Sequence, residues 1–134
     1  MNSFPYTTAL VTGASSGIGE AIARDLAKLN VSPVLVARSK DKLDALANEL
    51  GKSGLLVMSV PLDLTIPDSD EILWNELTKK QINIDLLVNN AGFGGYGFFH
   101  ESNIAKQSEM IELNVKALVR LTYRFLQPMI ERNH

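Results

Sequence analysis

Four short, largely apolar runs alternate along this 134-residue chain with longer segments of helical periodicity. The runs lie at residues 8–12, 34–37, 55–58 and 86–88, and runs of this kind are typical of strands buried on both faces of a parallel sheet. Apolar residues recur at helical spacing in the segments 20–30, 40–50, 68–80 and 103–131. Strands that alternate with helices in this way predict one α/β domain.

Local signals set several boundaries of these elements. Pro33 begins the second strand, and Gly51 ends the second helix. Asp68 and Glu71 resemble a capping box at the start of the third helix, and Pro128 is expected to bend or end the fourth. Right-handed crossovers then give a three-layer, Rossmann-type doubly wound parallel sheet with strand order 3-2-1-4.

Composition narrows the possible functions. The chain has no cysteine, which excludes disulfides, thiolate metal sites and a cysteine nucleophile, and its net charge of −2 gives no support for binding to nucleic acid or membrane surfaces. His100 and His134 lack partners at ligand spacing, so no metal site is predicted, and His100 is interpreted as a loop residue. No secretion signal or membrane-spanning run is visible, so we expect a cytoplasmic protein.

A glycine-rich segment connects the first strand to the first helix with the spacing G-x-x-x-G-x-G. Gly13 would turn the chain off the strand, Gly17 would leave space for a pyrophosphate, and Gly19 would let the helix pack close to the sheet. The helix N-terminus and two serine hydroxyls would supply donors to phosphate, although a plain glycine-rich turn is the alternative. The candidate cofactor-binding residues here are Gly13, Ser15, Ser16, Gly17, Ile18 and Gly19.

With three further motifs, the chain resembles the short-chain dehydrogenase/reductase family. Residues 12–19 match the family's T-G-x-x-x-G-x-G, and residues 89–92 match its N-N-A-G after the fourth strand. Asp63 matches the acidic residue after the third strand, and Asn114 matches the asparagine of the fourth helix. The four motifs occur in the family's order and extend over the whole chain, which makes residues 1–134 the expected N-terminal half of that fold.

The resemblance gives roles to Asp63 and Asn114. Asp63 would bond the adenine amino group, with Leu64 beside the ring, although Asp63 taken alone is more simply a turn residue ahead of Pro67. Asn114 would belong to the family's catalytic Asn-Ser-Tyr-Lys tetrad, distorting the helix locally and holding a water linked to the lysine. Taken alone, Asn114 would be a residue on an exposed polar face.

The resemblance also gives a role to the segment after the fourth strand. Asn90, with Ala91 and Gly92, would lie along the ribose side of the cofactor, and Asn89 would tie the strand to its neighbours. An asparagine pair after a strand is otherwise only a turn. The aromatic and glycine-rich loop that follows, residues 93–100, would lie near the substrate mouth or pack under the fourth helix.

The end of the second strand bears on the choice of cofactor. NAD-dependent enzymes usually place an acid there to bond the ribose 2′-hydroxyl, whereas this chain has Arg38 and Ser39 after Ala37. A guanidinium and a hydroxyl would hold a 2′-phosphate, which predicts NADP(H). Alternatively, Arg38 is a solvated loop cation and Ser39 only caps the second helix, and nearby Asp41 and Lys42 blur the local charge.

The catalytic segment of the family has no match in these residues. Family members are longer, and none of the three tyrosines here (Tyr6, Tyr96 and Tyr123) has a lysine four residues later. The chain is therefore interpreted as the C-terminally truncated, NADP(H)-binding part of an oxidoreductase for small carbonyl or alcohol substrates, inactive by itself. A non-enzymatic nucleotide-binding module and a remnant without cofactor affinity are the alternatives.

Two features predict self-association. The fourth strand would form an apolar sheet edge that is open to pairing. The 103–131 helix carries apolar residues around more than one face, so it is expected to be buried on several sides. The chain is therefore expected to form a homo-oligomer through this helix, or to be a piece of something longer.

Overall fold

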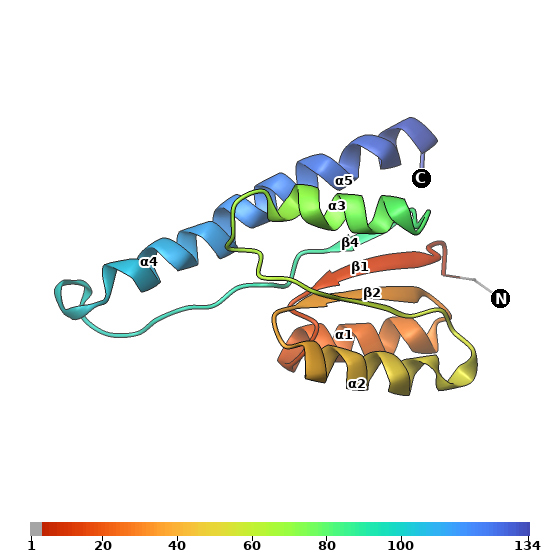
Figure 1. The fold of residues 1–134 in the computed structure, drawn as a ribbon, viewed down its shortest axis with the longest axis horizontal. Coiled ribbons are helices and arrows are strands. Elements are labelled where there is room, and N and C mark those ends of the chain that lie inside the picture. Colours follow the sequence, from red (N-terminus) through yellow and green to blue (C-terminus); the bar gives the residue numbers. More distant parts are fainter. Residues whose placement is uncertain (1–3) are drawn as a thin grey trace.

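The computed structural model describes residues 4–134 and contains a four-stranded parallel sheet (Figure 1). Residues 1–3, part of the N-terminal segment for which no secretion signal is predicted, lie outside the described residues. The strand order is β3-β2-β1-β4, which confirms the Rossmann-type topology expected from the sequence. The strands are β1 (Thr8–Thr12), β2 (Ser32–Ala37), β3 (Met58–Pro61) and β4 (Leu86–Val88).

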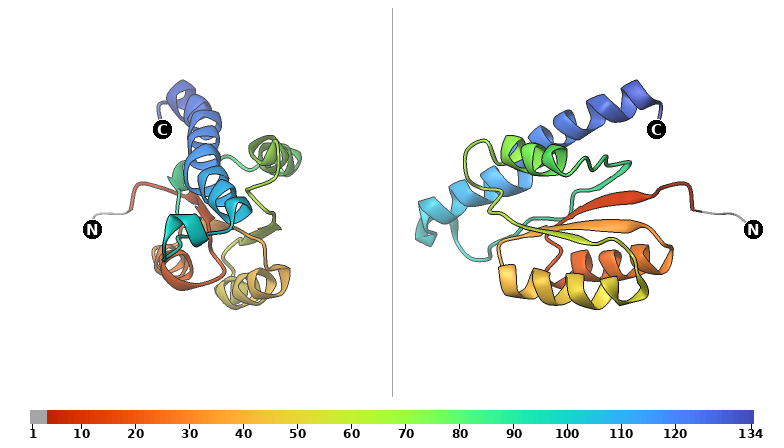
Figure 2. Two further views of the ribbon diagram at one scale, coloured as in Figure 1. Left: turned by 90° about the vertical axis from the view of Figure 1, so that its left-hand side faces the viewer. Right: turned by 45° about the vertical axis from the view of Figure 1, so that its right-hand side comes forward.

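Helices cover both faces of this sheet, so the fold has three layers (Figures 1 and 2). One face carries α1 (Gly17–Lys28) and α2 (Lys40–Leu50), with a short 3₁₀ turn η1 (Gly51–Ser53) after α2. The other face carries α3 (Ser69–Lys79) and α5 (Leu118–Arg132). A 3₁₀ turn η2 (Phe99–Glu101) precedes α4 (Ile104–Ile111), and the π-helical segment η3 (Glu112–Ala117) joins α4 to α5.

The core consists of two layers of apolar side chains, one on each face of the sheet. Alternate residues of a strand point to opposite faces, so Ala9 and Val11 of β1 pack toward α1 and α2, whereas Leu10 packs toward α3 and α5. Leu121 and Phe125, both buried, bring α5 onto the second layer. The central strands β1 and β2 are thus fixed from both sides, and the loops at their ends are held in place.

The third strand lies three residues beyond its predicted position of 55–58. It spans Met58–Pro61 because pairing with β2 sets its register, with Met58 opposite Val34 and Val60 opposite Val36. Val60 enters the core in this register, while Leu56 stays 71% exposed before the strand. Pro61 is tolerated because β3 is an edge strand.

Three helix boundaries differ in detail from the sequence predictions. Asp68 precedes α3 in a left-handed conformation (φ 58°), and its side chain makes no capping bond. Pro128 does not end the last helix, which continues to Arg132, since a proline there removes only one backbone bond while Leu121 and Phe125 anchor the helix. The first helix begins at Gly17 rather than at residue 20, so it starts inside the glycine-rich motif.

The second helix has the predicted bounds, but its end is built differently from the prediction. Gly51 follows it in a right-handed conformation and continues into the 3₁₀ turn, so the reversal to left-handed geometry occurs at Gly54, with φ 90°. Glycine suits position 54 because a residue with a side chain would be strained at this positive φ.

Candidate functional site

A cavity of about 570 Å³ lies at the carboxyl ends of the four strands. Its walls come from the segments that follow β1, β2, β3 and β4, together with Glu109 of α4 and Leu113 of η3. In open α/β sheets, ligands bind at this edge of the sheet. All the predicted site residues line the cavity except Gly17, Gly19 and Asn114.

A different steric reason explains the glycine at each of three positions in the first loop. A Cβ on Gly13 would lie 2.8 Å from the Asn90 side-chain nitrogen, and Gly13 has φ 63°. A Cβ on Gly19 would collide with the Gly13 carbonyl, so the close approach predicted for Gly19 is to the loop that leaves β1. Gly17 has a left-handed φ of 55° and open space where a Cβ would lie. The start of α1 is therefore open to a ligand.

A threonine at the end of β1 connects this loop to the segment after β4. The Thr12 hydroxyl, nearly fully buried, accepts hydrogen bonds from the backbone N–H groups of Asn90 (3.0 Å) and Ala91 (2.9 Å). In return, the Asn90 side-chain amide donates to the carbonyls of Thr12 (3.1 Å) and Gly13 (3.2 Å). The sequence analysis did not select Thr12, although it is the first residue of the glycine-rich motif.

The two asparagines after β4 contact different elements. While Asn90 binds the glycine-rich loop, the Asn89 side chain donates to the hydroxyl of Thr122 on α5 at 2.9 Å. Asn89 was expected to bind neighbouring strands, but its side chain binds α5, the helix that covers them. Together the two residues place the start of the loop that walls the cavity.

Asn114 lies within the π-helical segment η3, where the helix is widened for about one turn. Its side-chain oxygen accepts from the backbone N–H of Phe93 at 3.0 Å, and its nitrogen donates to the Phe93 carbonyl at 2.7 Å. A Cβ on Gly92 would lie 2.8 Å from the same oxygen. Asn114 is exposed, but its amide holds the loop that lines the cavity.

Asp63 occupies the wall that follows β3 and also forms a local turn. Its carboxylate accepts from the backbone N–H (2.9 Å) and hydroxyl (2.7 Å) of Thr65. Burial alone would raise the pKa of Asp63, but the Thr65 bonds and the positive charge of Arg38 together hold that pKa below its ordinary value. Asp63 is therefore an ionised acceptor at the cavity, next to Leu64, which is largely buried.

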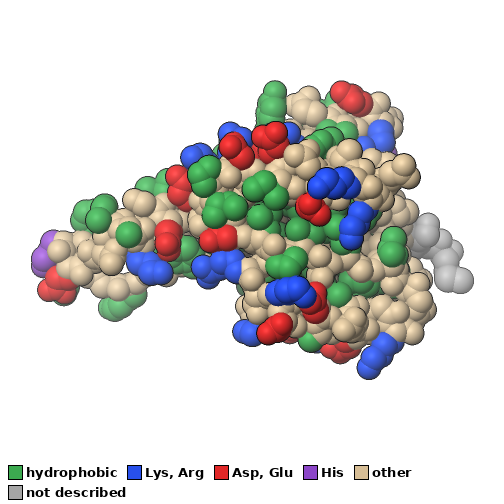
Figure 3. All heavy atoms as spheres, viewed as in Figure 1, with side chains coloured by type: hydrophobic (Ala, Val, Ile, Leu, Met, Phe, Trp, Pro, Cys, Tyr) green, Lys and Arg blue, Asp and Glu red, His purple; other side chains and the backbone are tan. Residues whose placement is uncertain are grey.

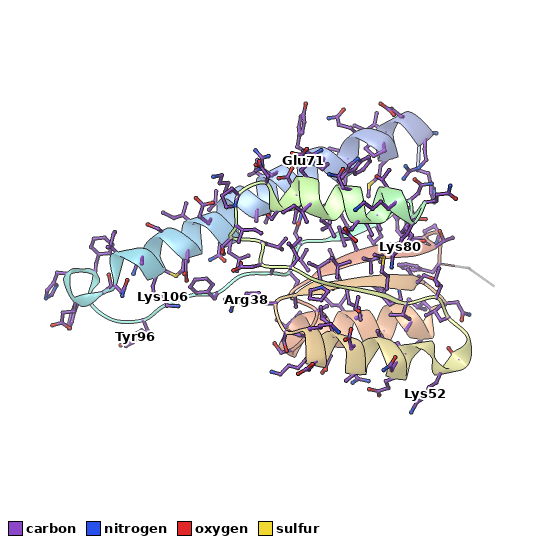
Figure 4. The ribbon with its side chains drawn as sticks, in the orientation of Figure 1. Arg38, Lys52, Glu71, Lys80, Tyr96 and Lys106 are labelled. Atoms are coloured by element: carbon purple, nitrogen blue, oxygen red, sulfur yellow. The ribbon has the colours of Figure 1, made fainter. Side chains whose placement is uncertain are left out.

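Cations line the cavity at the corner between β2 and α2. Arg38 is exposed and extends from the end of β2 toward the side along which the loop after β4 runs (Figure 4). Ser39 is the N-cap residue of α2 but makes no side-chain capping bond, so its hydroxyl is not engaged by the helix. Lys42 also lines the cavity, and the sequence analysis treated it only as a charge that blurs the signal.

The aromatic loop projects away from the sheet with the start of α4 (Figures 1 and 3). Tyr96, Phe98 and Phe99 are at least 71% exposed, so these side chains do not pack under the last helix. Phe93, half-buried, is the aromatic residue of this loop that lines the cavity. The substrate-mouth interpretation stays a prediction.

Residues 4–134 contain neither a metal-ligand cluster nor a helix suited to crossing a membrane. No group of three or more His, Cys, Asp or Glu side chains is placed to hold a metal ion there. Within the same range, no helix is long and apolar enough to cross a membrane.

Comparison with known proteins agrees with this arrangement. The family model for short chain dehydrogenases matches residues 7–134. This chain belongs to that family. It is 40% identical over 126 residues to dehydrogenase/reductase SDR family member 7 of Mus musculus, covering 91% of the chain and 37% of the relative.

Two further similarities are informative. NADP-dependent 3-hydroxy acid dehydrogenase YdfG of Escherichia coli (strain K12) is 35% identical, covering 93% of the chain and 50% of the relative. The crystal structure of L-sorbose reductase from Gluconobacter frateurii, complexed with NADPH and L-sorbose, superposes with a TM-score of 0.87 at 36% identity, covering 95% of the chain and 49% of that protein. The chain thus spans between 37% and half of the length of these proteins.

Proposed function

We propose that residues 1–134 form the NADP(H)-binding unit of an oxidoreductase, corresponding to the N-terminal half of the family fold. The reaction is hydride transfer between the nicotinamide and a small carbonyl or alcohol substrate. The observation that carries this proposal is the cavity at the strand ends, which brings the glycine-rich loop, Arg38, Ser39 and Asp63 to one place. Its position is the one at which doubly wound sheets bind dinucleotides.

The residues present fit the parts of this cofactor. Ser15, Ser16 and Ile18 lie around the open N-terminus of α1, where backbone N–H groups and the helix dipole favour a pyrophosphate. The ionised Asp63 suits an amino group of the adenine, and Leu64 offers an apolar surface to its ring. The segment of Asn90, Ala91 and Gly92 is the wall for the ribose.

The choice of NADP(H) over NAD(H) rests on Arg38 and Ser39. Both line the cavity directly after β2, where an acid would repel a 2′-phosphate. Two of the similar proteins described above are named for NADP or contain NADPH, which supports the same choice.

Within the reaction, this chain's own residues bind and orient the cofactor. The nicotinamide, when bound, supplies or accepts the hydride. Asn114 holds Phe93 through both backbone groups and so fixes the wall that follows Gly92. We assign Asn114 to the catalytic constellation, in which it keeps this wall and the widened helix in place.

The cellular setting and the assembly of the protein are further parts of this proposal. The protein acts in the cytoplasm as a homo-oligomer assembled through the 103–131 helix. The support for assembly is an apolar face of this helix that is exposed in the chain, including Ile111, Val115 and Val119.

The test is a binding titration on the protein as its gene encodes it. NADPH and NADH are titrated separately by fluorescence, with wild type and Arg38→Asp. We expect wild type to bind NADPH at least about tenfold more tightly than NADH, and the variant to lose this preference. An Arg38→Asp protein that still preferred NADPH would overturn the cofactor assignment.

Turnover separates an enzyme from a nucleotide-binding module. The same protein is assayed with NADPH against a panel of small ketones and aldehydes. Oxidation of NADPH that depends on one of these carbonyl compounds supports the oxidoreductase. Tight NADPH binding without turnover of any substrate supports the module instead.

A further inference from the structure

Lys42 is a second cation on the cavity wall, and no carboxylate engages it. It lies in the first turn of α2 and lines the cavity with Arg38 and Ser39. No ion pair or hydrogen bond of its ammonium is present in the described part of the chain, residues 4–134. Its charge is therefore available to a ligand.

The neighbouring lysine differs in this respect. Lys40 binds the carboxylate of Asp44 at 2.5 Å, and Asp44 also accepts from the Ser59 hydroxyl of β3 at 2.9 Å. The pKa of Asp44 is lowered, first by the Lys40 hydrogen bond and then by Ser59. Lys40 is thus neutralised by a carboxylate on its own helix, and it does not line the cavity.

Helix geometry explains why one lysine faces the cavity. Residues three apart on a helix share a face, so the N-cap Ser39 and Lys42 point to the same side, whereas Lys40 and Asp41 do not. Both Ser39 and Lys42 indeed line the cavity, and Asp41 does not. The exposed Asp41 therefore does not neutralise the positive charge at this corner of the cavity.

The negative charges on the cavity wall lie elsewhere. Of its two carboxylates, Asp63 comes from the segment after β3 and is already bonded to Thr65. Glu109 comes from α4, which projects away from the sheet (Figure 1), and pairs with Lys106 at 3.4 Å. The corner between β2 and α2 therefore combines two cations, a hydroxyl and the positive end of a helix.

We propose that Lys42 is a specificity-determining residue that binds the 2′-phosphate of NADP(H) together with Arg38 and Ser39. This inference rests on the proposed function, because it assumes that the cavity holds a dinucleotide. Arg38 supplies a planar fork, and Lys42 supplies a point charge from the helix side of the same phosphate. An NAD(H) molecule carries no phosphate at that position and gains nothing from Lys42.

The experiment compares Lys42→Ala with the matched control Lys40→Ala in the protein as its gene encodes it. Dissociation constants are measured for NADPH, NADH and 2′,5′-ADP, a probe that contains only the adenosine and 2′-phosphate part. We expect Lys42→Ala to weaken NADPH and 2′,5′-ADP about fivefold and to leave NADH within about twofold. Lys40→Ala should leave all three constants unchanged.

Salt gives a second readout that a structural effect would not produce. Because salt screens exposed charges, raising the ionic strength should reduce the NADPH-to-NADH preference, and less steeply in Lys42→Ala than in wild type. A charge-reversing Lys42→Glu protein should lose more of the preference than Lys42→Ala.

The outcomes separate this inference from the proposed function. If Arg38→Ala weakens NADPH selectively while Lys42→Ala and Lys40→Ala behave like wild type, Lys42 has no such role and the proposed function stands. Equal losses for NADPH and NADH in Lys42→Ala would also overturn the inference, since the effect would not concern the phosphate. If wild type binds neither dinucleotide, both proposals fail.

Discussion

At the scale of single residues, Asp70 is a buried charge that joins α3 to α5 on one face of the sheet. Its carboxylate accepts hydrogen bonds of 2.7 Å from Arg120 and from Arg124, both on α5, while Asp70 itself lies in the first turn of α3. We expect Asp70→Ala to lower the free energy of unfolding by about 2 kcal/mol, because it leaves two arginines without their partner. Urea unfolding followed by circular dichroism measures this loss, and an unchanged midpoint would contradict it.

The same carboxylate gives a pH dependence of known sign. Burial would raise the pKa of Asp70, but the hydrogen bonds and charges of Arg120 and Arg124 hold it below its ordinary value. A group with a lowered folded-state pKa stabilises the fold above its unfolded pKa of about 3.9, and this contribution is lost as pH falls through the folded pKa. The stability difference between wild type and Asp70→Asn should therefore be constant near neutral pH and shrink below about pH 4, as measured by urea unfolding across pH.

Two glycines of the first loop make a matched pair of substitutions. Gly19→Ala would place a methyl group against the Gly13 carbonyl, a backbone atom that cannot move aside easily, so we expect a loss of about 2–3 kcal/mol. Gly17→Ala has open space, and its cost is only the left-handed φ of 55°, about 1 kcal/mol. Thermal unfolding of the two variants should rank them in this order, and the reverse order would contradict the steric explanation.

Most residues of the cavity wall could be predicted from the sequence because motif spacing fixes them locally. Gly13 and Arg38 follow directly on strands, so recognising the strand places the residue, whereas Asp63 was selected through the family resemblance. Thr12 and Lys42 were missed for a different reason. Thr12 acts through contacts with Asn90, which is distant in the sequence. Lys42 could be told apart from Lys40 only in the structure, where Lys40 pairs with the carboxylate of Asp44.

At the scale of elements, the sequence predicted which strands and helices form better than where they begin. The third strand was misplaced by three residues because periodicity cannot distinguish 55–58 from 58–61, whereas pairing of Val60 beside Val36 can. The π-helical segment around Asn114 was expected only through the family resemblance. Its residues are ordinary for an α-helix, and the bonds from Asn114 to Phe93 arise from tertiary structure.

The contact between η3 and the loop after β4 can be tested as an element. Asn114→Ala removes both bonds to Phe93, so we expect the backbone amide of Phe93 to exchange with solvent at least about tenfold faster. Asn114→Asp keeps the acceptor for that amide and should show a smaller increase. Hydrogen exchange detected by NMR or mass spectrometry measures both. Equal protection in wild type and Asn114→Ala would show that the loop does not depend on this side chain.

At the scale of the whole molecule, the continuous helical segment of α4, η3 and α5 has two apolar faces, one buried and one exposed. One face, with Leu121 and Phe125, is buried on the sheet. The other face is open in the single chain, so the expected burial on several sides stays a prediction, and hydrophobic atoms are visible along the projecting helix in Figure 3. This stripe consists of Ile111, Val115, Leu118, Val119, Tyr123, Leu126 and Ile130, each 41% exposed or more.

We expect an exposed stripe of this length to be a surface for association rather than an ordinary solvated face. A second copy of the chain can bury it by placing the same stripe opposite, which is the self-complementary arrangement of a two-fold dimer. Charge at the centre of such an interface is costly, so Val119→Asp should shift the protein to the mass of a single chain in light scattering. The control is Leu56→Asp, since Leu56 is 71% exposed but lies before β3 and is not part of the stripe. Loss of association in both variants, or in neither, would contradict assembly through this helix, because only Val119 belongs to the stripe.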